Sequence, residues 1–224
     1  MISVAIDGPA GAGKSSISKT ASKKLGFIYV DTGALYRSIA LNFIRKGADE
    51  SLSCDIDGIL KQTSVEIRFV NGEQHVFLNG EDVNDKIRTP EVSLMASAVS
   101  AKPQVREFLL DMQRNLAKTN NVLMDGRDIG TVVLPDATVK IFLTASEKVR
   151  AERRYKELCE KGIKADFDEV YNDIVKRDFN DMNRPVAPLK QAKDAILADT
   201  SALDFEQSVE LIIRIIKEKT GEIL

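Results

Sequence analysis

Eight residues near the N-terminus have the types and the spacing of a phosphate-binding loop. Gly8-Pro9-Ala10-Gly11-Ala12-Gly13-Lys14-Ser15 matches the pattern G-x-x-x-x-G-K-[ST]. Glycines let backbone N–H groups turn toward phosphate oxygens without Cβ clashes, and the N-terminus of a following helix adds partial positive charge. We therefore expect Lys14 to reach the β- and γ-phosphates of a nucleoside triphosphate and the Ser15 hydroxyl to bind Mg²⁺.

The segments on either side of this loop are those that the motif requires. The apolar run Ile2 to Ile6 precedes it and is typical of a buried strand, whereas Ile17, Ala21 and Leu25 follow at helical spacing. The alternative is a glycine turn before an ordinary helix. Because the pattern and both flanks agree, the sequence predicts nucleoside triphosphate binding.

Asp125 is the candidate acidic partner of the loop. It ends an apolar strand and is followed by Gly126. Phosphate-loop enzymes place at this point the carboxylate that holds Mg²⁺, either directly or through water. The alternative is a strand-end aspartate that only makes a turn.

Arginines suggest a second phosphate-bearing substrate. Ligands of parallel α/β sheets bind beyond the carboxyl ends of the strands, and guanidinium groups bind phosphate in bidentate fashion. Any single arginine could equally be a solvated surface residue. The arginines in question follow predicted strands (Arg37, Arg127), follow a hairpin (Arg88), open a helix (Arg106), cluster together (Arg150, Arg153, Arg154) or flank Asp181 on one helical face (Arg177, Arg184).

The chain offers little for general base catalysis. His75 is its single histidine, and it lies in a predicted hairpin strand, where a surface role is favoured over a ligand role. A phosphate acceptor is already an anion at neutral pH and needs no base. Phosphoryl transfer would then depend on positioning and on charge neutralisation by Lys14, Mg²⁺ and arginines.

Composition limits the class of protein. The chain has 224 residues, 43% of them hydrophobic and 29% charged, with a formal net charge of −2, as expected for one large globular domain with a small insertion. This charge does not favour nucleic acid or an anionic membrane as partner, and no apolar run is long enough to span a bilayer. Cys54 and Cys159 show neither disulfide nor zinc spacing. With a strand starting at once and no room for a leader, we expect a cytoplasmic protein.

The order of elements predicts an α/β fold, with a parallel sheet of five strands and helices on both faces. Helices are expected after the loop, from Leu35 to near Gly47, from Pro103, from a cap at Ser146, from an Asp166–Glu169 capping box to Pro185, and at the C-terminus. The five expected strands are residues 2–6, 27–31, 121–125, 138–143 and 195–199.

An antiparallel unit is expected to interrupt this order. Residues 65–70 alternate with period two and meet Asn71-Gly72, a strong hairpin signal. A two-residue loop would place Val65 opposite Leu78, Ile67 opposite Val76 and Arg68 beside His75 on the other face. We expect an insertion at about residues 60–85, without a large core of its own.

The chain resembles the bacterial-type cytidylate kinases, nucleoside monophosphate kinases of the phosphate-loop class, from end to end. The string Asp-Gly-Arg-Asp-x-Gly-Thr-Val-Val is highly specific, whereas the phosphate loop alone is not. The segments that carry the resemblance are residues 6–15, 31–37 (Asp-Thr-Gly-Ala-Leu-Tyr-Arg), 87–92 (Ile-Arg-Thr-Pro-Glu-Val), 125–133, and Arg177-Asp178 through Asp181 to Arg184.

The resemblance implies ATP-dependent phosphorylation of CMP and dCMP by a single kinase domain over residues 1–224. It implies an acceptor-binding insertion at about 58–100 and a lid at about 150–165 that closes over ATP. Gly8 to Ser16 and Arg153 match ATP-binding positions, and Lys14, Arg127, Arg150, Arg154 and Arg184 match catalytic ones. Arg37, Arg127 and Arg184 match residues that hold the acceptor phosphate, and Thr32, Arg177 and Asp181 those around the ribose. Ser97, Arg106 and Asp128 match residues that read cytosine, Tyr36 and Arg88 further pocket positions, and Ser15 and Asp125 the metal ligands.

Other functions remain open at this stage. A kinase for another small acceptor, such as UMP, AMP or shikimate, would use the same loop. A phosphate-loop regulatory ATPase would instead need a residue that positions water, and switch regions. We expect a monomer whose ligands are ATP and CMP or dCMP, with no nucleic acid and no membrane.

Overall fold

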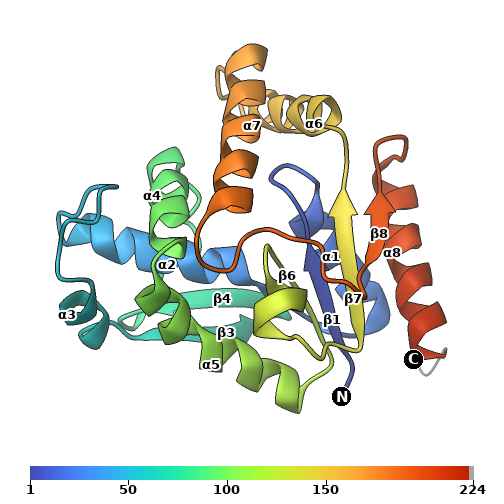
Figure 1. Ribbon diagram of the computed structural model, residues 1–224, viewed down its shortest axis with the longest axis horizontal. Helices are drawn as coiled ribbons and strands as arrows, with labels where there is room; N and C mark the ends of the chain where they lie inside the picture. The colour runs from blue at the N-terminus through green and yellow to red at the C-terminus, as the bar shows by residue number, and fades with distance from the viewer. Residues whose placement is uncertain (222–224) are drawn as a thin grey trace.

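A computed structural model describes residues 1–221 of the protein, and five short apolar strands form the central sheet. All are parallel, in the order β2-β6-β1-β7-β8 (Figure 1). This arrangement confirms the predicted α/β class, and each strand lies within a residue or two of its expected position. The strands are β1 (Ser3–Asp7), β2 (Ile28–Asp31), β6 (Val122–Gly126), β7 (Val139–Thr144) and β8 (Ile196–Asp199).

Both faces of this sheet are buried by helices. Val4 and Ile6 of β1 pack into one apolar cluster with α1 (Lys14–Leu25) and α8 (Phe205–Thr220). Ala5, which points to the opposite face, packs in another cluster with Ile129 and Val133 and with the apolar side chains of α5 (Pro103–Thr119). Parallel strands covered in this way read as continuous apolar runs, which is why their positions could be predicted from the sequence.

The insertion is an antiparallel sheet of three strands, β3 (Val65–Val70), β4 (Glu73–Leu78) and β5 (Glu81–Asp82). Its register is the predicted one: Val65 pairs with Leu78, Ile67 with Val76 and Arg68 with His75. Asn71 and Gly72 both have positive φ, 52° and 79°, as a two-residue hairpin turn requires.

The antiparallel sheet shares its core with helices α2 (Thr32–Arg45), α4 (Pro90–Ser100) and α5. Val76 and Leu78 are buried in one cluster with Leu35 and Phe43 of α2. The same cluster includes apolar side chains of α4 and α5. In Figure 1, α2 runs between α4 and the two longer insertion strands.

Several elements carried no clear signal in the sequence. These are α3 (Ile56–Lys61), α4, β5 and a short π-helix, η1 (Ile129–Val133). The expected capping box at Asp166 is only half formed, because Asp166 caps the amide of Glu169 without a return bond. A complete capping box lies instead at Asp204 and Gln207, where both hydrogen bonds are present.

Two helices stand above the carboxyl ends of the strands. α6 (Glu147–Glu160) follows β7 and α7 (Phe167–Asn183) returns toward the sheet (Figure 1). Ser146 caps α6 as predicted, and α7 ends two residues before Pro185, whose ring cannot continue a helix.

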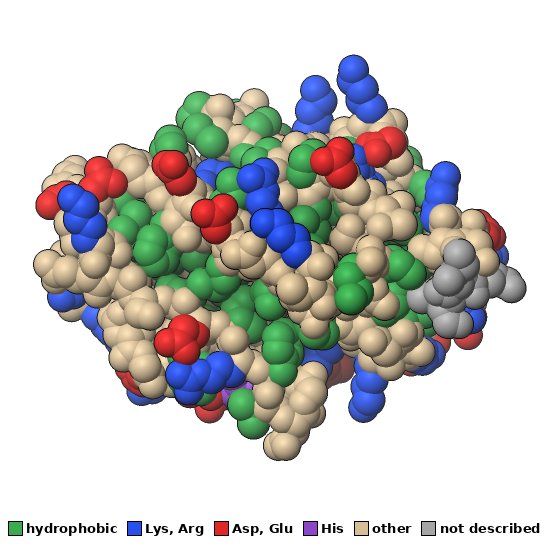
Figure 2. Space-filling model, turned by 90° about the horizontal axis from the view of Figure 1, so that it is seen from below, with side chains coloured by type: hydrophobic (Ala, Val, Ile, Leu, Met, Phe, Trp, Pro, Cys, Tyr) green, Lys and Arg blue, Asp and Glu red, His purple; other side chains and the backbone are tan. Residues whose placement is uncertain are grey.

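The surface carries charges of both signs. On the face in Figure 2, Lys and Arg side chains lie between Asp and Glu, with hydrophobic atoms exposed among them. Among residues 1–221, no helix is long and apolar enough to cross a membrane.

Candidate active site

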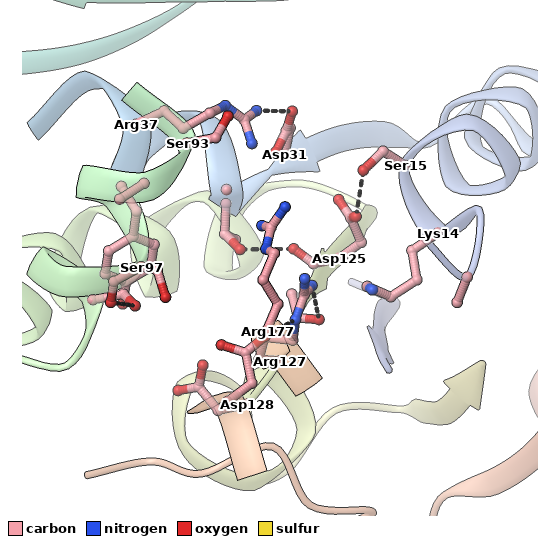
Figure 3. A pocket seen from close by; sticks show the side chains of 18 of the residues that line it. Lys14, Ser15, Asp31, Arg37, Ser93, Ser97, Asp125, Arg127, Asp128 and Arg177 are labelled. Atoms are coloured by element: carbon pink, nitrogen blue, oxygen red, sulfur yellow. Dashed lines mark hydrogen bonds and ion pairs between the residues drawn. The ribbon is translucent and has the colours of Figure 1, made fainter. Parts of the chain in front are cut away.

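A cavity of about 280 Å³ lies beyond the carboxyl ends of β1, β2 and β6. This is the position that a parallel α/β sheet offers to ligands. In Figure 3, Lys14 and Ser15 lie on one side of the cavity and Ser97 on the other, with Arg127 and Arg177 between them. Residues predicted for the site that line the cavity are Gly11 to Ser16, Thr32, Tyr36, Arg37, Ser97, Arg106, Asp125, Arg127, Asp128, Arg177, Asp181 and Arg184.

The phosphate loop fits its place only because of glycine. A Cβ on Gly8 would lie 2.0 Å from the carbonyl oxygen of Leu143 in β7, so no side chain can be tolerated there. Gly13 precedes α1 with φ 82°, in the left-handed region. Lys14 is buried, and its ammonium group donates to the carbonyl oxygens of Gly8 and Pro9, each at 2.7 Å. The ammonium group is thus held over the loop.

Ser15 and Asp125 meet at the start of α1. The Ser15 hydroxyl donates to Asp125 Oδ2 at 2.9 Å, and the Tyr29 hydroxyl donates to Asp125 Oδ1 at 2.9 Å. Burial, followed by the nearby charge of Asp31, raises the pKa of Asp125 to about 6. A carboxylate so far removed from water is well placed to gain from a cation.

At the far end of the cavity, two arginines hold Asp128. Arg106 donates to Asp128 Oδ2, and Arg184 donates to Asp128 Oδ1 at 3.4 Å. The guanidinium of Arg106 also lies 5.5 Å from the centre of the Tyr36 ring. Asp128 is 4% exposed, and burial raises its pKa although the arginine charges oppose the shift. Hydrogen-bond acceptors and donors therefore lie side by side at this largely buried end of the cavity.

Arg127 and Asp181 form the middle of the cavity. Arg127 Nε donates to Asp181 Oδ2 at 2.8 Å. Burial acts to raise the pKa of Asp181, but the Arg127 charge and hydrogen bond outweigh it and the pKa is lowered. Arg177, one helical turn before Asp181 on α7, lines the same space.

Asp31 gathers two further arginines at the start of α2. Its carboxylate caps the helix through the amide of Ala34 at 2.9 Å and accepts from Arg37 at 2.9 Å. Arg88, which is mostly exposed and lies outside the cavity lining, comes within 3.6 Å of the same carboxylate. Figure 3 shows the contact between Asp31 and Arg37.

The three clustered arginines of α6 lie outside the cavity lining. Arg150 is buried under the phosphate loop, where it donates to the carbonyl oxygens of Ala10 and Ala145, each at 2.8 Å, and pairs with Asp178. Arg153 donates to the carbonyl oxygen of Thr200 at 2.7 Å. Arg154 pairs with Glu157 on the helix surface at 2.7 Å.

The cytidylate kinase family sequence model matches residues 4–218. The chain belongs to this family. A cytidylate kinase of Caldicellulosiruptor saccharolyticus is 49% identical over 220 residues, covering 98% of this chain and 97% of the relative. One from Caldicellulosiruptor bescii is 50% identical over 214 residues, covering 96% and 95%.

Solved structures share the fold at low identity. A gluconokinase from Sinorhizobium meliloti 1021 superposes with a TM-score of 0.51 at 13% identity, covering 99% of this chain and 95% of that one. An uncharacterized protein from Eubacterium ventriosum superposes with a TM-score of 0.54 at 12% identity, covering 97% and 99%. At these identities the likeness concerns the fold alone.

The structure adds residues to the site of this cytidylate kinase family member that the sequence did not single out. Asp31, Ser93 and Ser100 line the cavity, and Tyr29 holds Asp125. Asp31 could have been found, because it lies at the carboxyl end of an apolar strand, where Asp125 also lies, one residue before the end of β6. Ser93 and Ser100 lie on α4, which had no recognisable pattern.

Proposed function

We propose that this chain transfers the γ-phosphoryl group of ATP to CMP and dCMP, giving CDP and dCDP. The observation that carries the proposal is one cavity with a phosphate loop at one end and an arginine–aspartate cluster at the other. Relatives of 49% and 50% identity over nearly the full chain are named cytidylate kinase.

The ATP end of the proposed site is the loop from Gly8 to Ser16. Its backbone amides and the helix N-terminus would bind the phosphates, with Lys14 moving from its two carbonyl partners to the β- and γ-phosphates. Gly8, Pro9 and Ala10 lie outside the cavity lining and support the loop through their backbone hydrogen bonds to Lys14, Asp178 and Arg150. Arg153 and Arg154 would complete the ATP side when residues 150–165 close as a lid. Arg150 would serve that side from its buried position under Ala10.

The acceptor end would hold CMP by its phosphate, ribose and base. Arg37, Arg127 and Arg184 supply the guanidinium groups for the phosphate. Thr32, Arg177 and Asp181 would surround the ribose, and Ser97, Arg106 and Asp128 the cytosine. Tyr36 lies under Arg106, and Arg88 would approach from the rim. Residues of about 58–100 would form the acceptor-binding insertion within a single domain.

The reaction would run without a general base. The acceptor phosphate is an anion at neutral pH, so the cavity needs only to bring its oxygen in line with the γ-phosphorus and to neutralise charge. Preorganised donors in a buried site perform that neutralisation with little reorganisation. Lys14, Arg127 and Arg184, which all line the cavity, are the donors that we propose for it.

The residues present fit a magnesium ion. Ser15 and Asp125 offer a hydroxyl and a carboxylate, the hard oxygen ligands that Mg²⁺ prefers. Ser15 Oγ and Asp125 Oδ2 lie 2.9 Å apart. Among residues 1–221 no group of three or more His, Cys, Asp or Glu could hold a metal, so phosphate oxygens and water would supply the other ligands. When bound, Mg²⁺ would neutralise charge on the β- and γ-phosphates.

The proposal also includes a monomer working in the cytoplasm, where both nucleotide substrates are available. Light scattering of the purified protein tests the first point, and fractionation of the source cells tests the second. A stable dimer, or recovery in a membrane or secreted fraction, would contradict it.

The deciding experiment is a coupled ADP assay with ATP, Mg²⁺ and each nucleoside monophosphate in turn. CMP and dCMP should give the highest kcat/KM. Faster turnover of UMP or AMP would reassign the acceptor, and ADP release at an equal rate without any acceptor would indicate an ATPase instead.

A further inference from the structure

One side-chain amide of the antiparallel insertion hydrogen-bonds to the backbone of a residue that lines the cavity. Gln74 of β4 accepts from the backbone N–H of Asp31 at 2.9 Å through Oε1, and its Nε2 donates to the backbone carbonyl of Asp31 at 3.2 Å. Asp31 is the last residue of β2, an edge strand of the parallel sheet. The amide of Gln74 thus pairs with both backbone groups of Asp31, as a neighbouring strand would.

Gln74 is itself held firmly in place. Asn84 Nδ2 donates to the backbone carbonyl of Gln74 at 3.0 Å, and Asn84 Oδ1 accepts from the amide of Val76 at 3.0 Å. A second link joins the same strand to α1, where Lys19 pairs with Glu73 at 2.8 Å. Both members of that pair are more than half exposed, so it contributes little stability.

The residue that Gln74 holds organises the arginines on its own side of the cavity. The Asp31 side chain is buried, caps α2 through Ala34, and orients the guanidinium of Arg37. Arg88 approaches the same carboxylate from the rim. A shift of the Asp31 backbone would therefore move both guanidinium groups, and small misplacements of a positioning group are costly in phosphoryl transfer.

We propose that Gln74 is a positioning residue for acceptor-phosphate binding, acting through the Asp31 backbone on Arg37 and Arg88. The proposal rests on the function given above and extends it to a residue outside the cavity lining. In this proposal the insertion contributes to the site, because the Gln74 amide fixes the Asp31 backbone relative to β4 and thereby positions the arginines. Gln74 lies outside the cavity lining and its side chain bonds only the Asp31 backbone, so we expect its main effect on the phosphate of the acceptor.

Two variants with a matched control test the proposal. Gln74→Met keeps the length of the side chain and removes both hydrogen bonds. Gln74→Glu keeps an acceptor for the Asp31 amide but places a carboxylate against the Asp31 carbonyl and near its side chain. Glu73→Gln is the control, since it weakens the neighbouring surface pair without touching Asp31. Circular dichroism and thermal unfolding establish that each variant folds.

The first measurement needs no nucleotide. Amide hydrogen exchange by NMR should show the Asp31 N–H protected in the wild type and in Glu73→Gln, and exchanging at least about tenfold faster in Gln74→Met. Unchanged protection in Gln74→Met would overturn the proposal. This result is independent of whether CMP is the acceptor.

The second measurement separates phosphate positioning from a general structural role. By calorimetry, the Kd for CMP should rise at least about threefold in Gln74→Met and more in Gln74→Glu, as expected for loss of a hydrogen-bonded support. The Kd values for cytidine, which has no phosphate, and for ATP should stay within about twofold of the wild type. Equal weakening of cytidine and CMP, or no weakening of CMP, would overturn it. Should the wild type not bind CMP, the proposed function fails, and the same comparison is made with the acceptor found in the ADP assay and its nucleoside.

Discussion

The guanidinium of Arg150 donates to the carboxylate of Asp178, and both side chains are buried, at 4% and 5% exposure. Asp178 also accepts from the backbone amide of Ala10 at 2.9 Å, and Arg150 donates to the carbonyl oxygen of the same residue. The tip of the phosphate loop is therefore clamped from α6 and α7 together. This pair is a structural support of the loop in the described conformation.

Breaking this pair should be costly. Asp178→Ala leaves a buried guanidinium without its counter-charge, and such losses amount to about 3–5 kcal/mol. The control is Arg154→Ala, which removes the exposed pair with Glu157 and should change stability by about 1 kcal/mol or less. Urea unfolding of both variants measures the difference. Similar effects for the two would show that the buried pair does not support the loop.

Lys14→Ala should remove most of the activity and leave the fold. The ammonium group lies over the loop on two carbonyl oxygens and contributes no packing to the apolar clusters. Loss of one preorganised electrostatic donor lowers kcat by about 10²–10³-fold. The coupled ADP assay measures kcat, with circular dichroism as the check on folding. Near-native turnover in a folded variant would contradict the role given to the loop.

Asp128→Asn should reduce the preference for CMP over UMP. The exocyclic amine of cytosine can donate a hydrogen bond to a carboxylate. Uracil has a carbonyl oxygen in its place, which a carboxylate repels. An amide can present either a donor or an acceptor, so the ratio of kcat/KM values should fall at least about tenfold.

Taking that ratio on one preparation removes the effect of any loss of folded protein. Because Arg106 and Arg184 already occupy both oxygens of Asp128, a purely structural role is the competing explanation. A structural role predicts that kcat/KM falls by the same factor for CMP and UMP, so that their ratio is unchanged.

The pH dependence of the free energy of unfolding should reveal the raised pKa of Asp7. Burial, only partly offset by hydrogen bonds from the amides of Gly130 and Ile129, raises the pKa of Asp7 from 3.8 to about 6. A raised carboxyl pKa favours the protonated folded state, so this contribution is present below about pH 4 and is lost as the pH rises through about 6. The shift corresponds to about 3 kcal/mol.

Asp7→Asn cannot titrate, which isolates the effect. The free energy of unfolding of the wild type, minus that of Asp7→Asn, should fall by about 3 kcal/mol between pH 4 and pH 7. Denaturant unfolding at each pH gives the difference. A constant difference across this range would mean that Asp7 has an ordinary pKa.

The elements best predicted from the sequence are those whose side chains follow one periodic pattern or contain one recognised motif. The strands of the parallel sheet are short continuous apolar runs, and the hairpin has Asn71-Gly72 between alternating segments, so even its register is confirmed. The buried residues of α4, Val92, Met95 and Val99, follow helical spacing, but exposed Leu94 and the alanines among them hide the apolar stripe. η1 depends on hydrogen bonds from the backbone amides of Ile129 and Gly130 to the carboxylate of Asp7. Asp7 is distant in the sequence, so no local pattern indicates these bonds.

The residues of the site were recognisable by type and motif, but not by partner. Nothing in the sequence spacing indicates that Arg150 points under the loop, while Arg177 lines the cavity. Both are arginines near the ends of predicted elements. Which of them faces the ligand depends on the packing of α6 and α7 above the sheet, and this packing is a property of the whole fold.

The amide of Gln74 has a consequence for association as well as for catalysis. An uncovered edge strand is a template on which another chain can add a strand, and β2 is one of the two edges of the parallel sheet. By occupying the backbone groups of Asp31, Gln74 blocks such pairing at the end of β2 that borders the cavity. The insertion thereby protects this end of β2 against pairing with a strand of another chain.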